Sequence, residues 1–96
     1  MEISTAYHAS DEIRNFSDDL VARAQSGDRE AMGQIFKTHH RFIFKFIYAM
    51  HGNHSLAEEM TQETFHGAYN GLSSLRGEVK LQTWLCGIAK NIVYQA

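Results

Sequence analysis

The chain has 96 residues and one cysteine, Cys86, so it is long enough for one domain and cannot form an internal disulfide. With 44% hydrophobic and 21% charged residues and a net charge of -2, its composition is that of an ordinary globular protein. No apolar run approaches the roughly 20 residues that cross a bilayer, and the acidic N-terminus lacks a signal peptide's apolar core, so we expect a cytoplasmic protein without membrane insertion.

Residues 1–16 are polar and show no periodicity, so we expect a flexible leader before a helical domain over 17–96. Ser17 can accept a hydrogen bond from a free backbone N–H group and therefore marks the start of a first helix. Gly27 marks its end, because glycine readily adopts the left-handed conformation that follows a helix. The apolar side of this helix consists of Leu20, Val21 and Ala24.

A longer second helix begins after Asp28, which can cap it, and ends at the break formed by Gly52 and Asn53. Its apolar residues recur every three or four positions, as in a helix with one buried side. This apolar set comprises Met32, Ile35, Phe36, His39, Phe42, Ile43, Phe46, Ile47 and Met50. Basic residues repeat every four positions on another side, namely Lys37, Arg41 and Lys45.

The third helix is expected to open with a capping box, in which Ser55 and Glu58 satisfy each other's backbone N–H groups. It ends near Gly71, and residues 72–79 form a loop around Gly77. The residues expected to face inward are Leu56, Ala57, Met60, Thr64 and Ala68.

A fourth helix runs from about Leu81 to the end of the chain. One complete apolar side comprises Leu81, Trp84, Leu85, Ile88, Ala89 and Ile92, so we expect Trp84 to pack in the core rather than to be exposed for a partner. A second side is polar and slightly basic, and comprises Lys80, Thr83, Gly87, Lys90, Asn91 and Tyr94. No stop signal occupies the last turn, which favours a domain excised from a longer protein over a naturally reduced protein, although the sequence leaves both open.

These patterns predict an all-α fold, a compact bundle of three to four helices without a sheet. Phe36, Phe46, Ile47, Trp84 and Ile88 should be mostly buried. Charge alternates along the chain, since segments 31–50 and 76–96 are net positive and segments 1–30 and 51–75 are net negative. Such segments can serve different partners, although on charge alone solvated helix faces are the simpler explanation.

Six histidines in 96 residues raise the question of a metal site. His51 and His54 lie three positions apart, but across the glycine-containing break, whereas zinc sites need several ligands at defined spacings. We therefore expect no metal and no cofactor. The chain also lacks a glycine-rich phosphate loop, a G-x-S-x-G turn and an H-E-x-x-H helix, and Cys86 has no base nearby in sequence, so we expect no enzyme.

The third helix carries a more specific pattern, because its spacing brings a polar set to one exposed face: Glu59, Gln62, Glu63 and His66. Phe65 and Tyr69 border this face. If both aromatic side chains are exposed, they make an anchor beside carboxylates that suits a partner helix. If both are core residues, the carboxylates are merely solvated, and the sequence leaves the two readings equally open.

The string EEMTQETFHGAY in this helix resembles region 2.2 of extracytoplasmic-function sigma factors, within the sigma-70 family. The preceding LVARAQSGDREAMGQIF resembles region 2.1, and the following RGEVKLQTWLCGIAKN resembles regions 2.3 and 2.4. Each block alone is a weak signal, but the three occur in the right order and spacing over residues 19–96. The chain is thus similar to region 2 of a transcription initiation factor.

This resemblance implies two sites and three partners. The residues implied to bind the β′ coiled coil of core RNA polymerase are Glu59, Gln62, Glu63, His66 and Tyr69. The residues implied to recognise the non-template strand of the −10 promoter element are Ser73, Ser74, Arg76, Lys80, Thr83, Lys90 and Asn91. Members of the family are commonly held inactive by an anti-sigma factor, which is the third implied partner.

The chain departs from the family pattern at Cys86 and Gly87, where a large polar or basic pair is usual. The basic stretch that often follows Asn91 is absent from this sequence, and so is the domain that reads the −35 element. The fourth helix carries few charged residues, which keeps one alternative open. In this alternative the chain is a helical interaction module without a DNA role, such as an adaptor or an anti-sigma-bound decoy. A metal- or ligand-binding bundle is a second alternative that rests on the histidine count alone.

Overall fold

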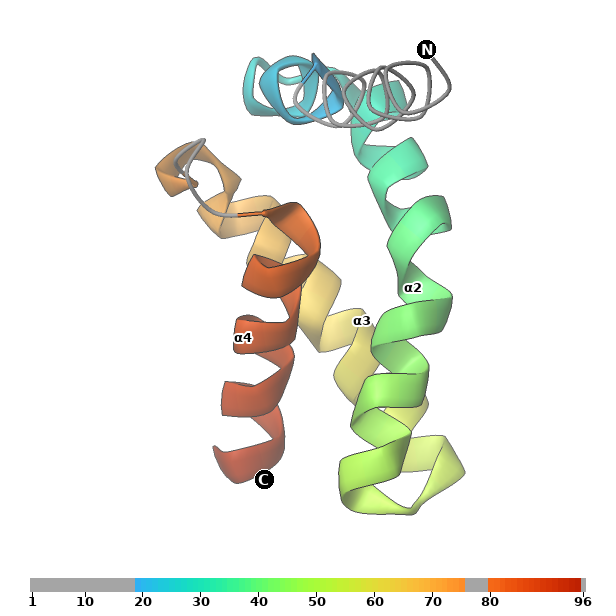
Figure 1. Cartoon of the computed structure of the whole chain (residues 1–96). Coiled ribbons are helices and arrows are strands. Elements are labelled where there is room, and N and C mark those ends of the chain that lie inside the picture. Colours follow the sequence, from blue (N-terminus) through green and yellow to red (C-terminus); the bar gives the residue numbers. More distant parts are fainter. Residues whose placement is uncertain (1–18, 76–79, 96) are drawn as a thin grey trace, which may run out of the picture.

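The computed structural model describes residues 19–75 and 80–95, which form helices joined by short turns and contain no strand. Helical residues 19–25 are followed by α2 (Arg29–His51), α3 (His54–Gly71), the 3₁₀ helix η1 (Leu72–Ser74) and α4 (Leu81–Gln95). In Figure 1, α2 and α3 form a hairpin, residues 19–25 cross the start of α2, and α4 packs along the hairpin. The predicted all-α bundle is confirmed.

The ends of α2 follow the sequence prediction. Oδ1 of Asp28 accepts hydrogen bonds from the backbone N–H groups of Glu30 and Ala31 at 3.0 and 3.2 Å, as an N-terminal cap does. Gly27 and Gly52 have positive φ angles of 100° and 82°, so glycine permits the sharp turns on either side of α2. The predicted start of the first helix at Ser17, like the leader 1–16, lies outside the described residues.

The predicted capping box of α3 is wrong. The helix begins at His54, and its cap is Asn53, whose side-chain oxygen accepts the backbone N–H of Leu56 at 3.0 Å. Glu58 instead lies 3.6 Å from Nδ1 of His54, one helical turn earlier. Asn53 takes the role because the chain leaves the turn at Gly52 in an extended conformation there, two residues before Ser55.

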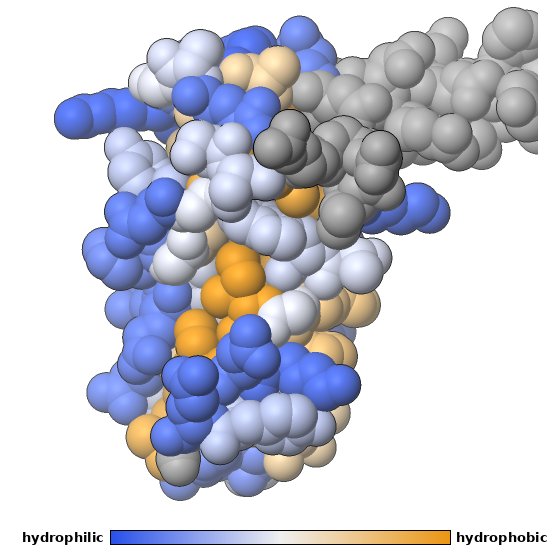
Figure 2. Space-filling model, turned by 90° about the vertical axis from the view of Figure 1, so that its left-hand side faces the viewer, coloured by the Kyte–Doolittle hydropathy of each residue, from blue (hydrophilic) through white to orange (hydrophobic). Residues whose placement is uncertain are grey.

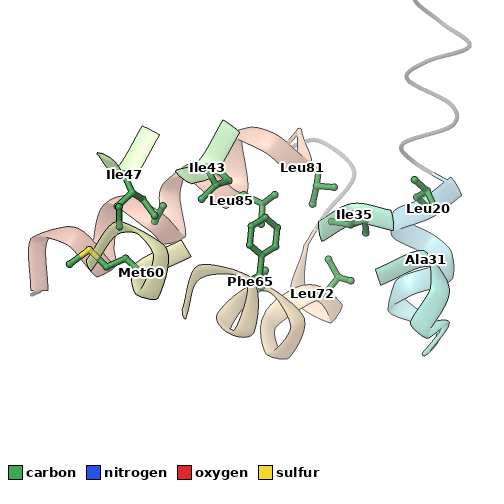
Figure 3. Packing of buried hydrophobic residues seen from close by; sticks show 13 residues of the cluster. Leu20, Ala31, Ile35, Ile43, Ile47, Met60, Phe65, Leu72, Leu81 and Leu85 are labelled. Carbon is green, nitrogen blue, oxygen red and sulfur yellow. The ribbon is translucent and has the colours of Figure 1, made fainter. Parts of the chain in front are cut away.

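One core joins all the described helices (Figure 3). Ile35, Ile43 and Ile47 from α2 are at most 1% exposed, and Leu85 from α4 is fully buried against them. Phe65 points from α3 toward Leu85 in Figure 3, so the α2–α3 hairpin and α4 share one packed interior. Burying one such side chain contributes roughly 1.5–3 kcal/mol, which makes this core the main source of stability.

The predicted burial is correct for Ile47 and wrong for Phe36, which is 38% exposed. Phe46, Trp84 and Ile88 are half-buried. The apolar set of α2 is wider than the surface its neighbours cover, and its outlying members Phe42 and Met50 are exposed. In α3, Leu56 is exposed for the same reason, whereas the other residues predicted to face inward are buried.

Helix α4 approaches α3 at two glycines. A Cβ atom at Gly71 would lie 3.7 Å from Cζ2 of Trp84, and one at Gly67 would lie 3.6 Å from Cγ2 of Ile88. Trp84 therefore packs on the backbone of α3, which agrees with its predicted place in the apolar side of α4. The side of the molecule to the left in Figure 1, where α4 lies, is largely hydrophilic around one small hydrophobic patch (Figure 2).

The first part of the predicted loop 72–79 is ordered by a long-range contact. Residues 72–74 form a 3₁₀ turn rather than a loop, and Nε2 of Gln25 donates hydrogen bonds to the carbonyl oxygens of Leu72 and Leu75 at 2.9 and 3.1 Å. The carbonyl oxygen of Leu72 also accepts the backbone N–H of Leu75 at 3.0 Å, so Gln25 adds a second bond there and joins the end of this turn to the first helical segment. Residues 76–79, including Gly77, lie outside the described part.

None of the helices described here is both long and apolar enough to span a membrane.

Candidate functional site

The polar face of α3 forms as predicted. Glu59, Gln62, Glu63 and His66 are all exposed, and their spacing of three and four residues aligns them along one side of the helix. The opposite side of α3 is anchored in the core, so this face sits on a rigid element. The site is therefore preorganised, with its side chains projecting from a fixed helix.

Two buried threonines are part of this anchoring. The hydroxyl groups of Thr61 and Thr64 donate hydrogen bonds to the carbonyl oxygens of Ala57 and Met60, each at 2.7 Å. Because these bonds stay within α3, the buried hydroxyls are satisfied and burying them costs little. The other buried residues of α3 are apolar: Ala57, Met60, Phe65 and Ala68.

The electrostatic character of α3 is negative. The helix carries Glu58, Glu59 and Glu63 and no lysine or arginine. Nε2 of His66 lies 3.3 Å from Nδ2 of Asn70, one turn further along the helix. Acidic side chains on an exposed rigid face favour a partner surface of positive charge.

Phe65 and Tyr69, whose burial the sequence left undecided, differ in their exposure. Phe65 is only 5% exposed and packs edge-on against the ring of Phe36, with 5.0 Å between ring centroids. Tyr69 is 57% exposed and remains on the surface beside His66. Only Tyr69 is thus free to contact a partner over most of its ring.

Two hollows between α2 and α3 were not predicted. The first, of about 430 Å³, is lined by Arg29, Met32, Gly33, Phe36, Phe65, His66 and Tyr69. The second, of about 310 Å³, is lined by Phe36, His40, Arg41, Phe44, His54, Glu58, Thr61 and Gln62. Sequence reasoning missed the α2 residues because it placed Phe36 in the core, and because a hollow depends on how two helices lie together.

The candidate nucleic-acid face is also exposed but sparsely charged. On α4 and just before it, Lys80, Thr83, Lys90 and Asn91 are exposed, and Nζ of Lys90 lies 5.8 Å from the ring centroid of Tyr94. Ser73 and Ser74 are exposed in η1, where the Ser74 hydroxyl donates to the carbonyl oxygen of Gly71 at 2.7 Å. The seventh predicted residue, Arg76, lies outside the described residues.

His39 and Cys86 have altered acidity. Burial lowers the pKa of His39 below its ordinary value of 6.5, although a contact with Gln82 opposes this shift. Burial also raises the pKa of the Cys86 thiol, which disfavours the nucleophilic thiolate. Within residues 19–75 and 80–95, no group of three potential metal ligands comes together.

Comparison with known proteins identifies the family to which this sequence is similar. Residues 35–96 match the family described as Sigma-70 region 2. The chain is 32% identical over 76 residues to the ECF RNA polymerase sigma factor BldN of Streptomyces coelicolor, an alignment that covers 78% of this chain and 29% of BldN. It is 33% identical over 72 residues to the ECF RNA polymerase sigma factor SigW of Bacillus subtilis, which covers 75% of this chain and 38% of SigW.

A third relative is the RNA polymerase sigma-H factor of Pseudomonas aeruginosa, which is 34% identical over 73 residues, 75% of this chain and 37% of that protein. The chain belongs to the sigma-70 region 2 family. It spans between 29% and 38% of the length of these three relatives.

Proposed function

We propose that this chain is the region 2 domain of an extracytoplasmic-function sigma factor, which binds core RNA polymerase in the cytoplasm and helps to open the −10 promoter element. The observation that carries this proposal is the exposed acidic face of α3, which lies within the segment that matches the family. Glu59, Gln62 and Glu63 would contact the β′ coiled coil of the polymerase, with His66 and Tyr69 at the border.

The DNA role is assigned to η1, the segment after it and the polar face of α4. Lys80 and Lys90 would contact phosphates, whereas Thr83 and Asn91 would bond base edges or sugars. Extruding a base costs a few kcal/mol, and stacking together with hydrogen bonds to the exposed base can offset this cost. The process needs no nucleotide hydrolysis, so the domain would act as a binding module rather than an enzyme.

The polymerase contact is tested by reversing the charge of Glu63. Glu63→Lys should weaken binding to a β′ coiled-coil fragment by about tenfold, since it replaces attraction with repulsion at an exposed position. Thermal stability should change little, because the side chain lies outside the core.

Glu30→Lys, the same charge reversal at an exposed position of α2, is the matched control and should bind like the wild type. Affinity is measured by titration at low ionic strength, where charge effects are largest. Equal affinity of Glu63→Lys and the control would contradict the assignment of this face.

A second candidate is a helical interaction module without a DNA role, held by an anti-sigma factor or acting as a decoy. It is favoured by one observation, that the 15 residues of α4 contain a single charged side chain, Lys90. The two candidates differ in DNA binding by the polymerase-bound domain, which the module would lack.

A further inference from the structure

We propose that Phe42 and Phe46 on α2 form a base-stacking platform, on which a single DNA strand bound to the polar face of α4 lays unpaired bases. This inference rests on the proposed function and deepens it, because it extends the DNA contact from α4 to a second helix. It also adds stacking on aromatic rings to a contact that otherwise consists of charges and hydrogen bonds.

The two rings of the platform are fixed in place and partly uncovered. Phe42 is 44% exposed, and Phe46 is half-buried because it packs against the core. The rings are inclined to each other by 16° with 6.5 Å between their centroids, so they present surfaces of nearly the same orientation. Exposed rings of this kind are what proteins use to bind single strands, since every base has a π face that can stack on them.

The platform lies on the side of α2 that is turned toward α4. His39, Phe42 and Phe46 are spaced by three and four residues and therefore share one side of α2. His39 meets Gln82 of α4. Because His39 belongs to this side, the two phenylalanines lie along the seam between the two helices.

The register of the two helices brings the platform beside the proposed DNA face. In Figure 1, α2 and α4 both run from the top of the view to the bottom. The seven residues from His39 to Phe46 cover about 10.5 Å, and so do the seven from Gln82 to Ala89. Phe46 is therefore near the level of Ala89 and of Lys90, the next residue, which is exposed. Since the proposed function assigns Lys90 to phosphates, the platform continues the DNA face across the seam.

The charges around the platform suit a polyanion. Lys45 follows Phe42 by three residues and is exposed on α2, and Lys90 is exposed on the α4 side of the seam. Beyond Glu30, neither α2 nor α4 contains an aspartate or a glutamate. A strand whose bases stack on the platform can thus place phosphates near lysines on both sides, and no acidic side chain of these two helices repels it.

A second copy of this chain is a less suitable occupant of the platform. A symmetric dimer through this side would bring the same patch of both copies together, with Lys45 and Lys90 of one copy near the lysines of the other. Like charges that face each other oppose association. A single DNA strand instead supplies apolar base faces for the rings and negative phosphates for the lysines.

Another aromatic pair on α2 provides a matched comparison. Phe44 and Tyr48 also stack, with 5.9 Å between centroids and 7° between planes, and Tyr48 is 44% exposed, as Phe42 is. This pair lies on the α3 side, where both rings meet His54 edge-on and Glu58 is 3.6 Å from His54. It therefore equals the platform in ring exposure but adjoins the negatively charged helix.

The experiment compares Phe42→Ala with Tyr48→Ala in the whole chain. Binding of a short single-stranded oligonucleotide of −10-like sequence is measured by fluorescence anisotropy at low ionic strength, where the lysine contacts are strongest. Phe42→Ala should weaken binding about five- to tenfold, as expected for the loss of one stack between a base and an aromatic ring. Tyr48→Ala should bind like the wild type.

A second oligonucleotide isolates the stacking. It has the same length but carries abasic nucleotides, so it keeps the phosphates and lacks the bases. The wild type should bind it more weakly than the intact oligonucleotide, and Phe42→Ala should bind it as the wild type does. If Phe42→Ala weakens binding of both oligonucleotides alike, the ring does not act by stacking and the inference is overturned.

The outcomes separate the platform from the proposed function. If Lys90→Ala weakens binding while Phe42→Ala binds as tightly as Tyr48→Ala, the platform is wrong and the α4 face stands. If neither Lys90→Ala nor Phe42→Ala weakens binding, both are wrong. If the wild type dimerises, Phe42→Ala does not, and both bind DNA equally, this side is an interface between copies and the platform is wrong.

A further pair of variants covers an effect of Phe42→Ala on folding. Should that variant lower the melting temperature, Phe42→Leu decides, because leucine keeps an apolar contact with Phe46 but has no ring. Phe42→Leu should lose the preference for the intact over the abasic oligonucleotide, whereas Phe42→Trp should keep it. A preference that is unchanged in Phe42→Leu would overturn the inference.

Discussion

Helices α3 and α4 both present an exposed polar face opposite a buried one, but the two faces differ in how much they offer a partner. Helix α3 carries three glutamates and no lysine or arginine, two of the glutamates lie on its exposed face, and hollows adjoin the helix along α2. The α4 face has only Lys90 within the helix and Lys80 just before it. In the proposed function, the α3 face would therefore make the stronger contact and the α4 face would add only a few charge contacts.

This difference suggests a division of labour between the helices. A domain with a strong protein-binding face and a weak nucleic-acid face binds DNA well only when another protein holds it beside the DNA, since tethering raises the local concentration of the second site. DNA binding by the domain would then depend on polymerase, because the domain carries few basic residues on its DNA face.

The largest effect should come from breaking the packing that holds α4 in place. Leu85 is fully buried between α4 and the hairpin, so Leu85→Ala should lower the free energy of unfolding by about 2–5 kcal/mol. Tyr94→Ala, at a position 72% exposed on the same helix, should change it by less than about 0.5 kcal/mol. Urea denaturation followed by circular dichroism measures both, and a small effect of Leu85→Ala would mean that α4 is not part of the common core.

A smaller loss of folding stability should appear on acidification, and it should again involve a residue that lies near α4. His39 lies half-buried on α2 near Gln82 of α4, and its Nδ1 atom has no hydrogen-bond partner among the described residues. Because burial lowers its pKa in the folded state, the unfolded chain takes up the proton first. Stability should therefore be complete above the ordinary value of 6.5 and decline as the pH falls below it toward the lowered pKa.

His39→Gln should reduce this loss of melting temperature between about pH 6.5 and 5, since glutamine does not titrate. His40→Gln, at the exposed neighbouring histidine, should retain the decline of the wild type. An identical pH dependence of His39→Gln and the wild type would show that another group causes the loss.

The sequence was sufficient for features that depend on local chemistry. Asp28, Gly27 and Gly52 were assigned correctly, because a cap or a left-handed turn depends on the residue itself and its immediate neighbours. The exposed face of α3 followed from helical periodicity. The cap of α3 was misplaced because two adequate caps, Asn53 and Ser55, lie close together, and only the path of the turn selects between them.

Features that depend on how the helices pack against one another could not be predicted from the sequence. Periodicity placed Phe36 in the core, although the neighbouring helices leave it partly uncovered. The contact of Gln25 with Leu72 joins residues 47 positions apart and has no signal in the sequence. The hollows along α2 are of the same kind, since each is lined by two helices.

The smallest effects should be those of single residues on the DNA face of α4. Lys90→Ala should weaken binding of single-stranded oligonucleotides of every sequence alike, because a lysine that contacts phosphate carries no base information. The slope of log K against log salt should become shallower by about 0.7, the value for one phosphate neutralised on a single strand. Titration at several salt concentrations measures both.

Asn91→Ala should act differently, although Asn91 is the next residue along the same exposed side of α4. An amide can donate to and accept from a base edge, so its loss should reduce the preference for a −10-like sequence over a scrambled one and leave the salt slope unchanged. The comparison is best made with the polymerase-bound domain, where tethering brings weak contacts into a measurable range. If neither variant alters DNA binding there, the α4 face is not the nucleic-acid site, and the interaction module without a DNA role becomes the better account of this chain.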